Sequence, residues 1–262
     1  MSTSAINNND LVLLYLKPHK SWLVRIKNGE KAHTHAGFIE HSAVIGKEFG
    51  SSIESSMGKT FRLMKPTIAD FLMRFSRPTQ VVYPKDLGMI AAWTGLSPGK
   101  IVVESGTGSG ALTAFMANLI RPNGHVHTYE IREEFMEVAK KNLQKIGLLD
   151  YVTLTKKDAK EGIDVREADI AIIDVGDPWT LVESFKNALK GSGMLAAISP
   201  TMNQAEKITA ELLEKGFIDV WSVELISRDL EARVGMTRPS MRMIGHTAYI
   251  TFARKGVNSA LV

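Results

Sequence analysis

The sequence of 262 residues contains no cysteine, which excludes disulfide bonds and thiolate metal ligands and favours a reducing compartment. It also lacks long apolar runs. Residues 1–10 are polar, and no later segment approaches the roughly 20 consecutive apolar residues of a membrane span. We therefore expect a cytoplasmic protein that does not enter a membrane.

The sequence has little excess charge of either sign, because 32 Lys and Arg stand against 28 Asp and Glu. The excess is unevenly distributed. Residues 1–90 hold 12 basic and 7 acidic residues, whereas residues 91–262 hold 20 and 21. This asymmetry suits contact of the N-terminal third with a polyanion, although an ordinary solvated surface accounts for it equally well.

The first part of the chain has the pattern of a small β-rich domain. Short runs with β-branched and aromatic residues at 11–16, 21–26 and 60–63 are separated by Pro, Gly and Asn. A helical pattern over residues 66–74 then leads into a second region. We expect one domain over residues 1–75 and another over residues 76–262.

From residue 100 onward, strand and helix patterns alternate. This alternation predicts βαβ units in a mostly parallel, doubly wound, Rossmann-like sheet, and hence an α/β fold. The expected strands are residues 101–104, 126–130, 152–155, 170–174 and 194–199, and the expected helices are residues 109–120, 133–146, a segment after Pro178, and residues 203–215.

The end of the chain breaks this alternation. Residues 218–226 and 247–252 both read as strands, with no helix-length segment between them. Such a hairpin would add an antiparallel C-terminal edge to the sheet.

The most informative segment is ESGTGSG at residues 104–110, a glycine-rich turn between an expected strand and helix. Its glycines allow the backbone to approach a ligand closely. Gly106, Gly108 and Ala111 also satisfy the dinucleotide-binding pattern, so a nicotinamide enzyme is an alternative. Glu104 opposes that alternative, because its charge would repel a pyrophosphate. A carboxylate instead suits S-adenosylmethionine, which has an ammonium and a sulfonium but no phosphate.

Two acidic residues after the next strands extend this pattern. Glu130 stands where both cofactor families bind ribose hydroxyls, and Asp158 where methyltransferases hold the adenine amino group. Taken alone, an aspartate at position 158 is more often a helix cap than a cofactor ligand. The combined positions predict a class I S-adenosylmethionine-dependent methyltransferase.

Further segments spread over nearly the whole chain resemble one family, the tRNA (adenine-58-N1)-methyltransferases. Glycine turns are common to many methyltransferases, whereas the Thr-Gln, Asp-x-x-x-Pro-Trp and Gly-His-Thr-Ala segments together are specific to this family. The similar segments are GFIEHS at residues 37–42, Ile45-Gly46, Phe49-Gly50, Pro78-Thr79-Gln80, YPKD at residues 83–86, ESGTGSG at residues 104–110, Asp174 with Pro178-Trp179, Ser199-Pro200 with Gln204, and GHTA at residues 245–248.

The resemblance implies S-adenosylmethionine as cofactor and the T-loop of the tRNA elbow as substrate, with adenine 57 as a further target left open. It also implies a homotetramer. Asp174 would be the catalytic carboxylate and Tyr83 would line the pocket for the target base. The residues implied to hold the cofactor are Gln80, Glu104, Gly106, Thr107, Gly108, Ser109, Gly110, Glu130, Asp158, Ala159 and Asp174.

Two departures from the family are visible, and neither affects an expected catalytic group. Gly176 stands where many members have Pro or Met, and the cysteines of some archaeal members are absent. Two other functions remain open at this stage. One is a different class I methyltransferase, such as one that repairs isoaspartyl residues in proteins. The other is a non-catalytic tRNA-binding subunit, which degenerate cofactor motifs would mark and which the intact motifs oppose.

Several side chains keep two interpretations. One interpretation of Asp174 is that it orients the target adenine, and the other is that it caps the helix after Pro178. Tyr83 and Trp179 stack on the base or belong to the core, with the core favoured for Trp179. His246 contacts tRNA or cofactor, or is a packed structural residue. The spacing of His33, His35 and His41 fits no metal-binding pattern, so no metal is expected.

Overall fold

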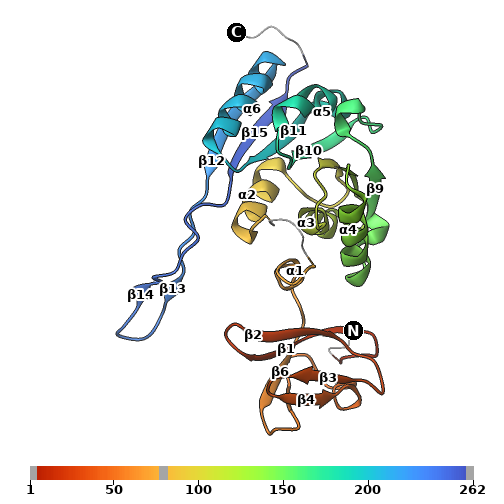
Figure 1. The fold of residues 1–262 in the computed structure, drawn as a ribbon, viewed down its shortest axis with the longest axis vertical. Coiled ribbons are helices and arrows are strands. Elements are labelled where there is room, and N and C mark those ends of the chain that lie inside the picture. The colour runs from red at the N-terminus through yellow and green to blue at the C-terminus, as the bar shows by residue number, and fades with distance from the viewer. Residues whose placement is uncertain (1–4, 77–81, 258–262) are drawn as a thin grey trace. The chain divides into compact units, whose positions relative to one another are not determined.

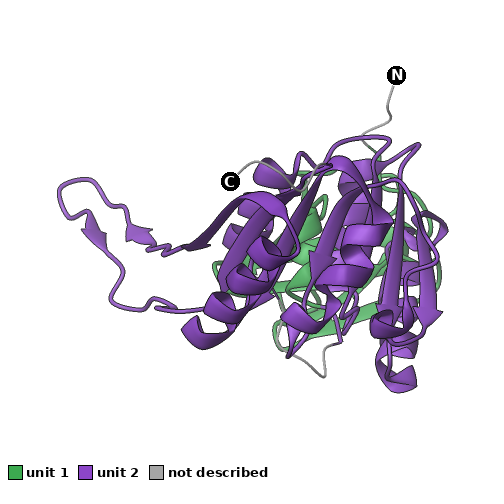
Figure 2. Ribbon diagram, turned by 90° about the horizontal axis from the view of Figure 1, so that it is seen from above, with its two compact units in different colours: residues 1–74 green, residues 75–262 purple. Residues whose placement is uncertain are grey.

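The computed structural model describes residues 5–76 and 82–257. The chain divides into two compact units, residues 1–74 and residues 75–262 (Figure 2). Among the described residues, no helix has the length and apolar character needed to cross a membrane.

The first unit is built on an antiparallel sheet with strand order β2-β1-β6-β5. Alternation along β6 buries Phe61 and Leu63 and exposes Arg62, which confirms the period of two that predicts a strand there. A hairpin and a short helix, whose Thr67 and Asp70 form a capping box, complete the unit. The elements are β1 (Leu11–Lys17), β2 (Lys20–Arg25), β3 (Lys31–Thr34), β4 (Gly37–Glu40), η1 (His41–Ala43), β5 (Ser52–Glu54), β6 (Thr60–Met64) and α1 (Ile68–Leu72).

The second unit contains a seven-stranded sheet with order β12-β15-β11-β10-β7-β8-β9. Strands β11, β10, β7, β8 and β9 pair in parallel, as the alternating pattern predicts. The closing hairpin does form the edge of the sheet: β15 inserts antiparallel between β11 and β12, and β12 is outermost. The strands are β7 (Ile101–Ser105), β8 (His125–Glu130), β9 (Val152–Lys156), β10 (Ala168–Ile173), β11 (Leu189–Ser199), β12 (Phe217–Glu224) and β15 (Tyr249–Lys255).

Helices cover both faces of this sheet (Figure 1). One face carries α2 (Pro84–Thr94), α3 (Ala111–Ile120) and α4 (Glu133–Lys145), and the other carries α5 (Val182–Ala188) and α6 (Met202–Glu214). Because both faces are covered, the central strand β10 is buried almost throughout. Short 3-10 helices η2 (Leu149–Tyr151), η3 (Ala159–Glu161) and η4 (Pro178–Leu181) lie in the connections.

Helix α2 is absent from the sequence-based expectation, although its end signals are present in the sequence. Pro84 occupies its first turn, and Gly95 ends it in a left-handed conformation with φ of 69°. Its importance lies in what it carries, because Tyr83, Lys85 and Asp86 all stand at its beginning.

Residues 225–248 form a long arm between β12 and β15, which the sequence analysis expects only as a hairpin connection. The short strands β13 (Leu230–Glu231) and β14 (Arg238–Pro239) pair within the arm, which extends away from the sheet of its own unit (Figure 1). The arm exposes large apolar side chains, an arrangement typical of a surface that another chain covers. These side chains are Ile226, Leu230, Val234, Met236 and Met241.

Candidate active site

The glycine turn joins the carboxyl ends of neighbouring strands. A Cβ atom on Gly106, whose φ is +94°, would lie 1.9 Å from the carbonyl oxygen of Asp174, so the close approach of the two backbones requires glycine. The Gly106 amide donates to the Tyr129 carbonyl at 3.0 Å, and the Asp174 amide donates to the Ser105 carbonyl at 2.9 Å. The ends of β7, β8 and β10 are thereby held at one place.

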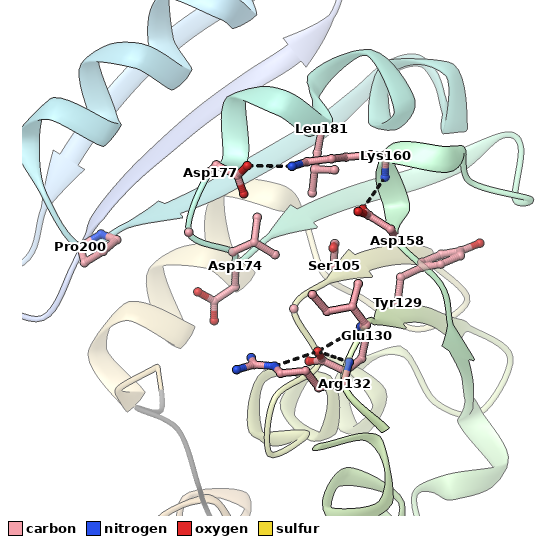
Figure 3. Close-up of a pocket in the computed structure, with 14 residues that line it drawn as sticks. Ser105, Tyr129, Glu130, Arg132, Asp158, Lys160, Asp174, Asp177, Leu181 and Pro200 are labelled. Atoms are coloured by element: carbon pink, nitrogen blue, oxygen red, sulfur yellow. Dashed lines mark hydrogen bonds and ion pairs between the residues drawn. The ribbon is translucent and has the colours of Figure 1, made fainter. Parts of the chain in front are cut away.

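A crevice opens at these strand ends in two connected parts. The larger part has a volume of about 400 Å³, and Figure 3 shows Glu130, Asp158 and Asp174 around it. The smaller part, of about 180 Å³, runs along the glycine turn and is lined by Thr107, Gly108 and Ser109. Gly106, Glu130, Arg132 and Asp174 border both parts.

Glu130 ties the end of β8 to the glycine turn. One carboxylate oxygen accepts from the Gly108 amide at 3.0 Å. The other accepts from the Ile131 and Arg132 amides at 3.0 and 3.1 Å. Three backbone donors therefore fix this carboxylate at the border of the crevice, where the sequence analysis expects it to bind ribose.

Glu104 lies beneath the turn and is fully buried, not among the side chains that line the crevice. Its Oε2 accepts from the Thr113 hydroxyl at 2.6 Å, whereas its Oε1 has no hydrogen-bond partner. Burial raises the pKa of Glu104 to about 8, an effect only partly offset by the hydrogen bond from Thr113 and by the nearby Thr128 hydroxyl. The group is therefore largely protonated at neutral pH.

Asp158 both lines the crevice and caps a helix. Its side chain accepts from the Lys160 amide at 2.9 Å as the N-cap of η3. The Lys160 ammonium in turn pairs with Asp177 at 2.7 Å, so an ion pair connects two walls of the crevice. Ala159, the next residue, is buried in the hydrophobic core.

Asp174 follows β10 directly and borders three cavities. Besides both parts of the crevice, it borders a cavity of about 220 Å³ lined by Tyr83, Pro200 and His246, which we call the base cavity. Burial raises the pKa of Asp174 to about 6. Within the described residues its carboxylate has no hydrogen-bond partner, and the N-cap position of η4 belongs to Asp177, so the interpretation of Asp174 as a helix cap is wrong.

A partly buried ion pair, which the sequence analysis did not identify, supports the base cavity. The Lys85 ammonium donates to Asp86 at 2.7 Å, to the Thr247 hydroxyl at 2.6 Å and to the Leu225 carbonyl at 2.8 Å. The Thr247 hydroxyl donates to Asp86 at 2.8 Å. The network joins the start of α2 to the start of β15, and the signal for it in the sequence is a Lys-Asp pair at a helix start.

His246 lies at the base cavity and bonds to protein on both sides. Its Nδ1 lies 2.6 Å from Glu224 Oε1, and its Nε2 lies 2.9 Å from the Pro200 carbonyl oxygen. Since both partners are acceptors, the ring satisfies both only when it carries two protons. The hydrogen bonds to Glu224 and to Pro200 raise the pKa of His246 accordingly.

The remaining predicted residues separate into several groups. Tyr83 borders the base cavity, and Gly110 is the N-cap of α3 and packs against Ala139. Trp179 packs against the hydrophobic core, with the Lys207 ammonium 4.9 Å from its ring centre, and does not line the crevice or the base cavity. Gln80 lies outside the described residues.

His33, His35 and His41 belong to no group of three His, Cys, Asp or Glu with metal-binding geometry within the part of the chain described.

Gln204 holds the loop that follows Asp174. Its side-chain amide donates to the Gly176 carbonyl at 2.7 Å, and the Thr201 hydroxyl that caps α6 contacts the Gln204 side chain at 2.8 Å. The loop between β10 and η4 is thereby anchored to the start of α6.

Comparison with known proteins gives a consistent picture. Residues 60–235 match a family model described as "tRNA methyltransferase complex GCD14 subunit". The chain is 38% identical to the tRNA (adenine(57)-N(1)/adenine(58)-N(1))-methyltransferase TrmI of Methanocaldococcus jannaschii, with 90% of this chain and 91% of that protein covered. Among solved structures, a protein described as a SAM-dependent O-methyltransferase from Thermotoga maritima superimposes with a TM-score of 0.92 at 36% identity, covering 98% of this chain and 97% of that one. The tRNA (m1A58) methyltransferase TrmI of Aquifex aeolicus gives a TM-score of 0.81 at 32% identity, covering 96% and 98%.

The contact between Gly106 and Asp174 predicts that a methyl group added at Gly106 strongly lowers the free energy of unfolding. Gly99 has a similar φ of +86° but no atom within 4 Å of its Cβ position, so Gly99→Ala measures the conformational strain alone, about 1–2 kcal/mol. We expect Gly106→Ala to lower the free energy of unfolding by about 3 kcal/mol more than Gly99→Ala, because a backbone must move. Denaturant unfolding of both variants tests this, and equal losses would contradict the steric explanation.

The raised pKa of Glu104 predicts a pH-dependent stability. Because the folded state keeps this proton up to about pH 8, while the unfolded chain releases it near 4.5, the free energy of unfolding falls as pH rises through that range. We expect Glu104→Gln to remove this part of the slope and to stabilise the ligand-free protein at pH 8. Unfolding measured at several pH values on both proteins tests the expectation, which fails if the two slopes coincide.

Proposed function

The chain belongs to the tRNA methyltransferase family described by the GCD14 subunit, and from this premise we propose that it transfers a methyl group from S-adenosylmethionine to N1 of adenine 58 in the T-loop of tRNA. The product is 1-methyladenosine. One observation carries the proposal: Asp174 stands at the border between the crevice and the base cavity. A methyl donor bound in the crevice and a methyl acceptor bound in the base cavity would meet at this carboxylate.

The crevice fits S-adenosylmethionine in charge and in backbone shape. Its border carries the carboxyl groups of Glu130, Asp158 and Asp174 together with the cations Arg132 and Lys160. This mixture suits a ligand that has a sulfonium, an ammonium and a carboxylate but no phosphate. The glycine turn at Thr107, Gly108 and Ser109, which lines the smaller part of the crevice, suits the amino-acid part. When bound, the cofactor supplies an electrophilic methyl group.

Residue roles follow from these positions. Glu130 would hold the ribose hydroxyls and Asp158 the adenine amino group, since both border the crevice. The turn residues Thr107, Gly108 and Ser109 would contact the methionine part. Gln80 keeps the cofactor role that the family resemblance implies.

Asp174 has the position and protonation state to orient the target adenine. Adenine N1 carries a lone pair, so it needs alignment with the methyl carbon more than it needs a strong base. An Asp174 carboxylate that accepts a hydrogen bond from the 6-amino group would fix N1 and stabilise the positive charge that develops on the ring, by a few kcal/mol in a water-poor site. With a pKa of about 6, the carboxylate is ionised at neutral pH.

The target base must leave its stack in the tRNA elbow to reach Asp174. Tyr83 provides an aromatic ring at the base cavity on which the extruded adenine can stack. The Lys85–Asp86–Thr247 network keeps this wall in place.

We further propose that the first unit contacts tRNA phosphates and that the protein acts in the cytoplasm as a homotetramer. Residues 1–74 hold 10 Lys and Arg against 6 Asp and Glu, and this basic excess supports the phosphate contact. The apolar arm supports assembly, because Ile226, Leu230 and Met241 are exposed in the single chain.

A second acceptor chemistry has one specific support, the Thermotoga maritima relative described as an O-methyltransferase. An Asp174 with a pKa near 6 could also take a proton from a hydroxyl group.

Mass spectrometry of nucleosides distinguishes methylation of adenine N1 from methylation of a hydroxyl group. Unmodified tRNA incubated with enzyme and cofactor should yield 1-methyladenosine at position 58, and the same mapping shows whether adenine 57 is modified. Methyl groups on ribose or on added hydroxyl compounds alone would contradict the proposal.

The position of Asp174 predicts a loss of rate without a loss of binding. We expect Asp174→Ala and Asp174→Asn to lower single-turnover methylation by roughly 10²–10³-fold, while tRNA affinity and thermal stability change little. Asp177→Asn is the matched control, because it removes the same charge from the same crevice wall. A near-normal rate for the Asp174 variants, or an equal loss for the control, would remove Asp174 from a catalytic role.

Phosphate contacts by the first unit predict a salt-dependent affinity for tRNA. The logarithm of the association constant should fall linearly with the logarithm of salt concentration. Replacing the exposed Lys59 and Lys65 with Gln should reduce the slope by up to about two, whereas the same change at the exposed Lys140 and Lys141 of α4 should leave it unchanged. Filter binding at several salt concentrations measures this. A flat response, or equal effects of the two pairs, would show that the first unit does not meet phosphates.

A further inference from the structure

A fourth cavity, of about 520 Å³, lies beside the base cavity and has no role in the function proposed so far. We call it the arm cavity, because it is formed by the start of α2 and the base of the arm. It shares Tyr83 and Ile244 with the base cavity, so the two are neighbours with a common wall. Its lining residues are Tyr83, Pro84, Lys85, Ser227, Asp229, Arg242, Met243 and Ile244.

Two charged groups of the arm cavity are unused by the protein. Both residues are exposed, and within the described residues of the single chain neither the Arg242 guanidinium nor the Asp229 carboxylate has a hydrogen bond or an ion pair. Other arm arginines differ: Arg228 donates to the Ser240 carbonyl at 3.1 Å, and Arg238 pairs with Glu231 at 2.7 Å. A cation and an anion in one cavity, both without protein partners, suit a ligand that offers a phosphate and a hydrogen-bond donor.

Among the remaining lining residues, Lys85 is already bonded to Asp86 and Thr247 and Ser227 is polar, whereas the other four are apolar or aromatic. Tyr83, Pro84, Met243 and Ile244 supply an aromatic ring, a thioether and aliphatic surface. Side chains of these kinds receive the face of a nucleobase, whose stacking depends little on base identity. The arm cavity therefore combines the groups needed for one nucleotide.

We propose that the arm cavity binds the nucleotide that adjoins the reactive adenine in the tRNA chain. Arg242 meets its phosphate, its base lies against Tyr83 and Met243, and Asp229 accepts a hydrogen bond from the base. The proposal rests on the tRNA methyltransferase function given above. Because the strand is continuous, a nucleotide next to an adenine in the base cavity must lie close to that cavity, where the shared wall places the second pocket.

This subsite would help to keep the target base out of its stack. Extrusion costs a few kcal/mol of lost stacking and pairing. A second nucleotide held against Tyr83 in the neighbouring cavity offsets part of that cost before any reaction. Arg242 and Asp229 lie outside the crevice and the base cavity, so their loss should affect the tRNA concentration needed, not the rate at saturation.

The first test replaces Arg242. In single-turnover methylation of a tRNA transcript, Arg242→Gln should raise the half-saturating tRNA concentration by about five- to tenfold, leave the saturated rate within about twofold and lower the salt slope by about one. Arg233→Gln is the matched control, because it removes the same charge from the same arm away from the cavity. Equal effects of the two substitutions would show general attraction and overturn the subsite.

The second test removes the neighbouring base from the substrate. Transcripts with an abasic nucleotide on the 5′ or the 3′ side of the target adenine are compared with the intact transcript. With the unaltered enzyme, one of the two should raise the half-saturating concentration by roughly five- to fiftyfold. That penalty should shrink to about twofold in an Asp229→Ala/Met243→Ala variant. No penalty on either side, or the same penalty in the variant, would overturn the proposal. If the unaltered enzyme fails to methylate the intact transcript, the proposed function itself fails and the subsite falls with it.

Discussion

The architecture of the second unit depends on the approach of two backbones, that of Gly106 and that of Asp174. A distance that leaves no room for a Cβ atom brings the ends of β7 and β10 together, and the Asp174 amide then reaches the Ser105 carbonyl. This contact determines where β10 ends, and therefore where the Asp174 carboxylate emerges. Because this contact holds the ends of β7 and β10 together, Asp174 lies where it borders both the crevice and the base cavity.

Around that contact the protein holds carboxyl groups under unfavourable conditions. Glu104 is buried with one oxygen unpartnered, and both Glu104 and Asp174 have raised pKa values because burial disfavours their charged forms. Burying these carboxyl groups does not itself stabilise the folded protein. A positively charged ligand does, because it favours the ionised form of each group. On the proposed function, acidic residues that weaken the empty protein would thus be stabilised by the positive charge of the bound cofactor and of the methylated ring.

The parts of this site that could be predicted are those set by local sequence. The glycine turn, Asp158 and Asp174 come after β7, β9 and β10, and Glu130 ends β8. Parallel strands bring such residues to one edge. Long-range features could not be predicted. The Lys85–Asp86–Thr247 network joins segments far apart in the chain, and the arm follows from no periodic pattern. Strands β3, β4 and β5 were missed because each has only three or four residues, too few to show alternation.

The two sides of the site come from different stretches of the chain. Residues 105–200 supply the large part of the crevice, while the base cavity takes most of its walls from residues 82–86 and from residues 244–248, at the end of the arm. In evolutionary terms, the donor half and the acceptor half can diverge separately. Changes confined to the hairpin between β12 and β15, and to the first turn of α2, could retarget the methyl group to a new acceptor while the cofactor half stays intact. On the proposed function, the closing hairpin is thus the segment through which this methyl-donor fold would acquire new substrates.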